Sequence, residues 1–443
     1  MAIRVGMVSL GCPKNQVDAE LMLAKLRAAG MELVPDAALA EVVVVNTCGF
    51  IEEAKQESID QILEFAKLKE EGRIKLLVAT GCLAERYQEE LERELPEVDV
   101  VAGIGANPDI VGLITKAYLD HTHVSAYPPK TALPLNGARV LTTLPHYAYL
   151  KIAEGCDNRC AYCAIPDIRG GYRSRPMEQI VEEAQWLADS GVKEIVVIAQ
   201  DTTRYGEDLY GTLKLAELLR RLCRIDGVKW YRVLYAYPDR VTDELLDVLA
   251  NEPKMAKYLD LPLQHVNGEV LRRMNRRGDA ASLTRLIRHI RQRVPGITLR
   301  TTLIAGFPGE TKAQFGELAE WVKEMKLERL GCFAYSQEEG TPAAQLDGQL
   351  DMDEKQRRAD IIMETQLRVH ERYCQRMVGR TVEVLVEGFD KYAGCYFGRG
   401  EADAPEIDGK IFFSADKPLE FGDEVCVTIE EALEYDLIGS LAE

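Results

Sequence analysis

The chain has 443 residues, a formal net charge of −18 and 11 cysteines. This length exceeds what one hydrophobic core usually serves, so we expect two or three domains. No run reaches the roughly 18 apolar residues of a membrane span, and the first residues lack a signal-peptide pattern, so we expect a soluble, cytoplasmic protein.

The cysteine count is odd, and the cytoplasm keeps thiols reduced. A disulfide framework is therefore the weaker interpretation, and metal binding by cysteine is the stronger one.

Residues 1–118 predict a small parallel α/β domain, because apolar strand patterns alternate with amphipathic helical stretches. Cys12, Cys48 and Cys82 each follow such a strand directly, in LGC, NTC and TGC. In a parallel sheet the carboxyl ends of the strands share one edge, where ligands bind. We expect a shared metal site there, although a lone buried cysteine is more often plain packing.

Residues 119–141 are rich in Pro, Thr and His without a sustained period, which indicates a linker. Residues 142–377 then alternate strands with helices six times, which predicts a partial parallel (βα)6 barrel of the TIM type with its chemistry at the strand carboxyl ends. The expected strands are AYLKIA, EIVVIAQ, WYRVLYA, YLDLPL, ITLRTTLIAG and RLGCFAY.

Residues 378–443 change to short alternating strands and predict a five-stranded, OB-like β-barrel. This segment has 5 basic and 16 acidic residues, a net charge of −11. Residues 1–120 have a net charge of −9, and the middle of the chain +2. Acidic ends repel phosphate and favour a basic partner, although many proteins are acidic simply for solubility.

The run CDNRCAYC follows the first barrel strand and supplies Cys156, Cys160 and Cys163. Three cysteines leave one iron of a four-iron cluster open to a further ligand. Zinc or a closed ferredoxin cluster would need a fourth Cys or His nearby, and the run contains none.

This C-x3-C-x2-C run after a barrel strand resembles the radical S-adenosylmethionine (SAM) superfamily. The resemblance implies that the three cysteines are catalytic, that the open iron holds SAM, and that one electron cleaves SAM into a 5′-deoxyadenosyl radical. Such a radical removes hydrogen from an unactivated carbon, which no side chain does as acid or base.

The combination of SLGCPKNQVDAE, NTCGF, TGC, the radical motif and a terminal barrel resembles the methylthiotransferases over nearly the whole chain. The resemblance implies a second [4Fe–4S] cluster on Cys12, Cys48 and Cys82, with SAM as both methyl donor and radical source. It also implies an electron donor and a sulfur donor.

Within these methylthiotransferases, the PKNQVDAE run, AYPD and LDLPLQH resemble the branch that modifies the β-carbon of an aspartate in small-subunit ribosomal protein 12. The terminal barrel resembles the TRAM domain, which usually binds RNA, yet it is acidic here. We therefore expect a basic ribosomal protein to dock on it and expect no direct nucleic-acid or membrane binding. The first alternative is a tRNA adenosine methylthiotransferase. The second alternative is not an enzyme but an electron-transfer protein with two clusters.

Weaker signals concern the SAM pocket. Tyr162 lies between two cluster cysteines, and Gln200, Asp201 and Arg300 are expected near strand carboxyl ends, where they could contact SAM or form internal salt bridges.

Three further features admit structural explanations. Arg169, Arg173 and Arg175 lie behind the cluster loop and could bind carboxylates or simply close a loop. GFPGET predicts a helix start with Thr311 in a capping box, and His265 fits a packed histidine better than an acid or base.

Overall fold

The computed structural model describes residues 2–442, which form two compact units. The first unit contains the chain up to Thr142 together with Lys151–Arg175 and Glu338–Thr341. The second contains the other described residues. The loop with Cys156, Cys160 and Cys163 therefore belongs to the compact unit that also contains the first three cysteines.

The first unit is built on a six-stranded parallel sheet in the order β2-β1-β3-β4-β5-β6. Its strands are β1 (Arg4–Ser9), β2 (Glu32–Leu33), β3 (Val42–Thr47), β4 (Leu76–Gly81), β5 (Val100–Ala102) and β6 (Val124–Ala126). Every residue of β3 and β4 is buried, as expected for parallel strands covered on both faces.

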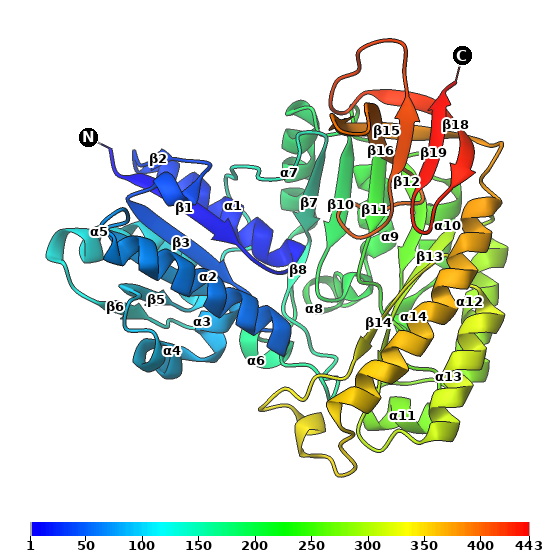
Figure 1. Ribbon diagram of the computed structural model, residues 1–443, viewed down its shortest axis with the longest axis horizontal. Helices are drawn as coiled ribbons and strands as arrows, with labels where there is room; N and C mark the ends of the chain where they lie inside the picture. Colours follow the sequence, from blue (N-terminus) through cyan, green and yellow to red (C-terminus); the bar gives the residue numbers. More distant parts are fainter. Residues whose placement is uncertain (1, 443) are drawn as a thin grey trace. The chain divides into compact units, whose positions relative to one another are not determined.

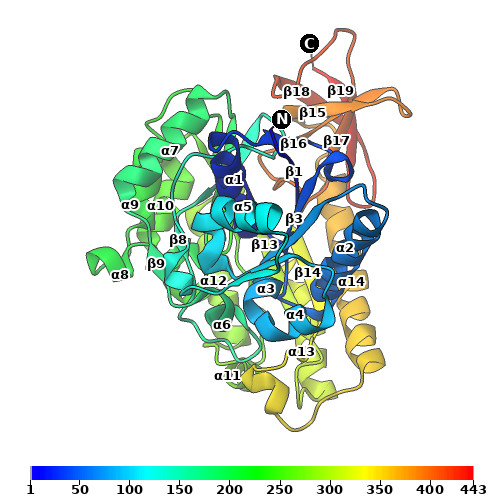
Figure 2. The ribbon, with the colours of Figure 1, turned by 90° about the vertical axis from the view of Figure 1, so that its left-hand side faces the viewer.

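Two hydrophobic cores lie on the two faces of this sheet. One contains side chains of α1 and α5, which lie next to each other in Figure 2, and the other contains side chains of α2, α3 and α4. The helices are α1 (Pro13–Ala28), α2 (Glu52–Glu70), α3 (Cys82–Arg86), α4 (Gln88–Glu94) and α5 (Ile110–Asp120), with 3-10 turns at Ala37–Leu39, Ile104–Asp109 and Lys130–Ala132.

The four strands predicted for this sheet are confirmed, and β2 and β6 are additional. β6 lies within residues 119–141, where the sequence indicates a linker, and it pairs with β5. The same unit holds β8 (Ala153–Glu154) and β9 (Arg173–Ser174), an antiparallel pair on either side of the cysteine loop and α6 (Ile165–Arg169).

The second unit contains an open six-stranded sheet in the order β7-β10-β11-β12-β13-β14, as Figure 1 shows. Neighbours from β10 to β14 pair in parallel, and this order confirms the predicted partial (βα)6 barrel. The strands are β7 (Tyr147–Lys151), β10 (Glu194–Ile198), β11 (Trp230–Val233), β12 (Met255–Asp260), β13 (Thr298–Ala305) and β14 (Arg329–Ala334).

Helices connect these strands, and the predicted capping box of Thr311 and Gln314 is present at the start of α13. The helices are α7 (Met177–Asp189), α8 (Glu207–Tyr210), α9 (Leu215–Leu222), α10 (Asp243–Asn251), α11 (Gly268–Arg273), α12 (Ala280–Arg293), α13 (Lys312–Met325) and α14 (Met352–Gln375), with 3-10 turns at Thr202–Arg204, Pro238–Arg240 and Pro342–Gln345. None of the helices in residues 2–442 has the length and apolar composition needed to cross a membrane.

The second unit ends in a closed five-stranded barrel in the order β15-β16-β17-β19-β18, which confirms the predicted small β-barrel (Figure 1). Its strands are β15 (Thr381–Asp390), β16 (Cys395–Gly400), β17 (Ile411–Ser414), β18 (Glu424–Ala432) and β19 (Leu437–Leu441). Alternating side chains of these strands, such as Val384, Val386, Ile411 and Phe413, fill its core.

Much of the barrel's acidic charge is directed at the parallel sheet of the same unit. Seven acidic side chains contact residues between Thr143 and Gln337, namely Glu383, Glu387, Glu401, Asp403, Glu406, Asp408 and Glu424. For example, Tyr147 donates to Glu406 at 2.7 Å and Tyr258 donates to Asp408 at 2.6 Å. The net charge of −11 therefore overstates the charge that the barrel offers to a partner.

Candidate active site and cluster-binding residues

Three cysteines lie at the carboxyl-end edge of the first sheet, as predicted. Cys12, Cys48 and Cys82 follow β1, β3 and β4, which are neighbours in the sheet. The ends of β3 and β4 are in register, with Thr47 opposite Gly81, so Cys48 and Cys82 start from adjacent positions.

Two glycines allow the loops that carry these cysteines to approach closely. A Cβ on Gly11, whose φ is 86°, would lie 2.7 Å from the Cys48 sulfur. A Cβ on Gly81, whose φ is 94°, would lie 2.5 Å from the Thr47 carbonyl oxygen. Both positions combine a left-handed backbone with a close approach, so larger residues would separate the cysteine loops.

The pKa values of the three thiols show that they influence one another. The pKa of Cys82 is raised to about 12, mainly by burial and also by the nearby Cys12 and Cys48, although Arg169 opposes the rise. Burial also raises the pKa of Cys48, and Cys12 contributes in the same direction. Burial opposes ionisation of Cys12 as well, but Lys14 and Arg169 outweigh it and lower the pKa. Iron must therefore displace protons from at least two of these ligands.

Three cysteines at one edge of a sheet are a ligand set that a [4Fe–4S] cluster can use, because each thiolate binds a different iron. Three ligands leave the fourth iron open to a further ligand. Among residues 2–442, no group of three Cys, His, Asp or Glu side chains is arranged around a single metal ion.

The second set of cysteines lies in one loop that is closed by its own backbone. The Cys156 amide donates to the Gly170 carbonyl at 3.1 Å, and the Cys163 amide donates to the Cys160 carbonyl at 3.0 Å. Gly155 has a φ of 76°, and a Cβ there would lie 2.2 Å from a backbone oxygen just after α6. Cys160 is buried while Cys156 and Cys163 are half-buried, so a bound cluster would keep an accessible side.

The predicted SAM-contacting residues are divided between the two units. Tyr162 is half-buried in the cysteine loop of the first unit, whereas Gln200 is half-buried just beyond β10 in the second. Arg300 was expected near the carboxyl end of its strand, and this placement is wrong because Arg300 is the third residue of β13, which spans Thr298–Ala305. Its guanidinium donates to Asp260 at 2.9 Å, which supports the internal salt bridge.

Asp201 and His265 also have structural partners. Asp201 is buried, accepts from Thr203 at 2.6 Å and pairs with Arg240 at 3.2 Å. His265 is fully buried, its Nδ1 accepts from the Asn267 amide, and burial lowers its pKa to about 3. A neutral, packed histidine agrees with the structural interpretation of LPLQH.

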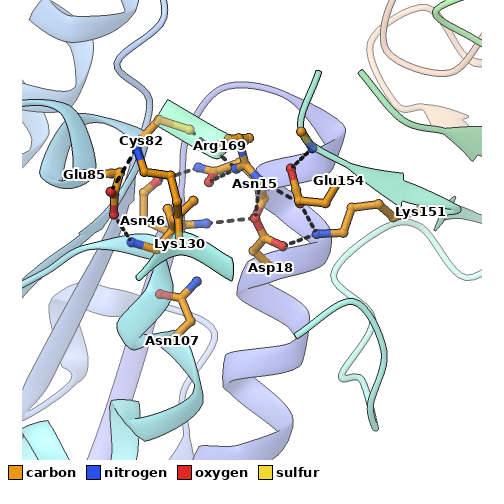
Figure 3. Close-up of polar contacts among 12 residues, drawn as sticks. Asn15, Asp18, Asn46, Cys82, Glu85, Asn107, Lys130, Lys151, Glu154 and Arg169 are labelled. Atoms are coloured by element: carbon orange, nitrogen blue, oxygen red, sulfur yellow. Dashed lines mark hydrogen bonds and ion pairs between the residues drawn. The ribbon is translucent and has the colours of Figure 1, made fainter. Parts of the chain in front are cut away.

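A buried charge network behind the cysteines was missed from the sequence (Figure 3). Arg169 donates to Asp18 at 2.8 Å and to Glu154 at 3.1 Å, and Lys151 pairs with the same two carboxylates. The other arm of Arg169 lies 3.4 Å from the Cys82 sulfur. A signal was available, because Lys151 interrupts an apolar strand and a buried lysine needs a partner.

Arg173 and Arg175 differ from Arg169. Arg173 donates to the Thr131 carbonyl, and the buried Arg175 donates to the Lys151 carbonyl at 2.6 Å. Both contacts fasten the loop to its own unit, which favours the loop-closing interpretation for these two arginines.

Comparison with known proteins assigns the family. A family model described as "Radical SAM superfamily" matches residues 150–322, one described as "TRAM domain" matches 378–441, and "Uncharacterized protein family UPF0004" matches 4–103. A ribosomal protein uS12 methylthiotransferase RimO from Desulforamulus reducens is 48% identical over 443 residues, 99% of each chain. The chain belongs to the RimO family. The RimO of Clostridium tetani is 47% identical over 438 residues, 99% of this chain and 98% of that one.

Solved structures support the fold of this RimO-family chain. The radical SAM methyltransferase TsrM from Kitasatospora setae matches with a TM-score of 0.55 and 15% identity, over 77% of this chain and 75% of that one. The cobalamin-dependent radical SAM enzyme OxsB matches with a TM-score of 0.52 and 15% identity, over 82% of this chain and 56% of that one. Both likenesses concern architecture alone.

Proposed function

We propose that this chain is a radical SAM methylthiotransferase that places a methylthio group on the β-carbon of an aspartate in ribosomal protein uS12. The observation that carries the proposal is the full-length identity of 48% to a RimO protein, combined with two three-cysteine sites in one compact unit. Enzymes of this kind use two [4Fe–4S] clusters and SAM. We place its action in the cytoplasm, where ribosomal proteins are assembled.

The chain's own residues fit two clusters. Cys156, Cys160 and Cys163 would hold the cluster that binds SAM, with one side open, as three-cysteine ligation requires. Cys12, Cys48 and Cys82 would hold the auxiliary cluster, the name used below for the cluster at the edge of the first sheet. When bound, these groups supply a carbon-centred radical and a sulfur-handling iron, chemistry that protein side chains do not provide.

The protein's contribution is to position and shield these groups. The backbone bonds of Cys156 and Cys163 fix the shape of the first loop, and the close contacts at Gly11 and Gly81 fix the edge of the sheet. Tyr162 and Gln200 remain our candidates for SAM contacts. Arg300 is a weaker candidate, because its guanidinium already pairs with Asp260. To bind SAM it would have to keep this partner at the same time or exchange it for SAM.

We further propose that uS12 docks through acidic side chains of the small barrel that point away from the parallel sheet. Exposed acidic residues remain in β18 and in the loops of the barrel: Asp416, Glu420, Glu430, Glu431 and Glu434. A basic ribosomal protein complements such a surface, whereas tRNA phosphates are repelled by it. An electron donor and a sulfur donor complete the expected set of partners.

The test is an anaerobic assay of the reconstituted enzyme with SAM, sulfide, a reductant and purified uS12, followed by mass analysis of uS12. We expect one methylthio group in place of one hydrogen, and no product from Cys156→Ala or Cys12→Ala. SAM cleavage without modification of uS12, together with modification of tRNA, would instead establish the tRNA alternative. Cluster reduction without any SAM cleavage would leave only an electron carrier.

A further inference from the structure

We propose that Arg169 is a positioning residue that hydrogen-bonds the Cys82 sulfur and raises the reduction potential of the auxiliary cluster. The inference rests on the proposed function, since it requires a cluster on Cys12, Cys48 and Cys82. It adds a specific role for a residue that ligates neither cluster.

The geometry places one guanidinium between a cluster ligand and a pair of carboxylates (Figure 3). Arg169 Nη2 lies 3.4 Å from Cys82 Sγ and 3.2 Å from Asn15 Oδ1, and Nη1 lies 2.8 Å from Asp18 Oδ2. The side chain is 1% exposed. Since a guanidinium is planar, holding one arm on Asp18 and Glu154 aims the other arm at the sulfur.

Without the Cys82 sulfur, the formal charges of this buried network sum to zero. Arg169 and Lys151 supply two positive charges, and Asp18 and Glu154 supply two negative charges when ionised. The carboxylates offset part of the charge of Arg169, which therefore acts on the Cys82 sulfur through its remaining field and through the directional N–H···S contact.

Arg169 also connects the two cysteine sites within the first unit. It is the last residue of α6, which begins two residues after Cys163. Ala164 and Ile168 of the same segment pack against Cys82 in a small apolar cluster. If the loop with Cys156, Cys160 and Cys163 moves when its cluster binds, the Arg169 N–H that faces Cys82 would therefore move with it.

A hydrogen bond to a ligating sulfur makes reduction easier, because it stabilises the additional negative charge of the reduced cluster. Lysine at this position keeps the positive charge but lacks the planar, two-armed guanidinium group. It therefore cannot hold both carboxylates and the sulfur in the same geometry. Arg169→Lys should therefore lower the potential of the auxiliary cluster without removing its ligands.

The experiment uses the full chain with Cys156, Cys160 and Cys163 changed to alanine, so that only the auxiliary cluster forms. Iron content and an anaerobic redox titration followed by electron paramagnetic resonance are compared with and without Arg169→Lys. We expect the Arg169→Lys chain to bind as much iron as its parent. At the same solution potential, its ratio of reduced to oxidised cluster should be about tenfold lower, which corresponds to a potential lower by about 59 mV for one electron. Arg139→Lys is the matched control, because Arg139 forms an equally buried ion pair with Glu20, which also lies on α1.

The outcomes are distinguishable. If the parent chain binds no iron, the proposed function fails first. If it binds iron and Arg169→Lys leaves the potential unchanged, the proposal about Arg169 is overturned. Should Arg169→Lys lose iron, the balanced variant Arg169→Gln with Asp18→Asn is measured, and a lowered potential there supports the proposal. Loss of iron from every Arg169 variant but not from Arg139→Lys would show a purely structural role and overturn it.

Discussion

Replacing Lys151 by methionine tests the buried charge network by its effect on stability. Lys151, Asp18, Glu154 and Arg169 are each at most 1% exposed, so none of their charges can be rehydrated without opening the unit. Lys151→Met leaves two carboxylates with one cation. Removing one partner of a buried ion pair costs about 3–5 kcal/mol, and we expect a loss of this size in the first unit.

A double variant separates charge imbalance from lost packing. Lys151→Met with Glu154→Gln leaves Arg169 paired with Asp18, a neutral arrangement. We expect the double variant to be more stable than the sum of the two single losses by about 2 kcal/mol, within the range known for residues in one network.

The assay must report on the first unit. All three tryptophans, Trp186, Trp230 and Trp321, lie in the second unit, so their fluorescence would miss the effect. Hydrogen exchange of the β3 amides, measured by mass spectrometry, gives the free energy of opening directly. Lys75→Met is the control, because Lys75 is 58% exposed in its pair with Glu41 and should have a much smaller effect. A loss below about 1 kcal/mol for Lys151→Met, with additive behaviour in the double variant, would show that the buried charges are not coupled.

Single substitutions of Gly11, Thr311 and Glu154 should each have a distinct, measurable effect. Gly11→Ala should abolish the auxiliary cluster while the other cluster forms, because the new methyl group meets the Cys48 sulfur; full iron content would contradict this. Thr311→Ala should destabilise the second unit by about 1 kcal/mol in urea unfolding, and an unchanged midpoint would show that the capping box contributes nothing. The pKa of Glu154 is lowered in the folded state, so its stabilising contribution should be full above about pH 4.3, the ordinary glutamate pKa, and be lost as pH falls further. Glu154→Gln should reduce the loss of stability at acid pH that hydrogen exchange measures. An unchanged dependence of stability on pH would show that Glu154 does not cause this loss.

The sequence predicts the strands of both parallel sheets well, because buried parallel strands are continuous apolar runs. The edge strands β2 and β6 were missed, since two or three residues carry no measurable period. Arg300 was misplaced within a correctly predicted strand, because it is the third residue of β13 and lies near the start of the strand, far from its carboxyl end at Ala305.

The cysteines of the candidate site were predictable, while their surroundings were not. Spacing after strands identifies Cys12 or Cys156, but no local pattern connects Asp18 on α1 with Arg169, 151 positions later. Similarly, composition gives the charge of residues 378–443 but cannot tell that Glu387 and Asp408 face the parallel sheet. Such pairings depend on tertiary packing, which a single sequence does not display.

Counting iron after anaerobic reconstitution shows whether the chain holds two clusters on two separate sets of three cysteines. We expect about eight irons per intact chain, and about four when either set of three cysteines is changed to alanine. A chain that binds about four irons, all of them lost on changing one set and none on changing the other, would contradict this expectation.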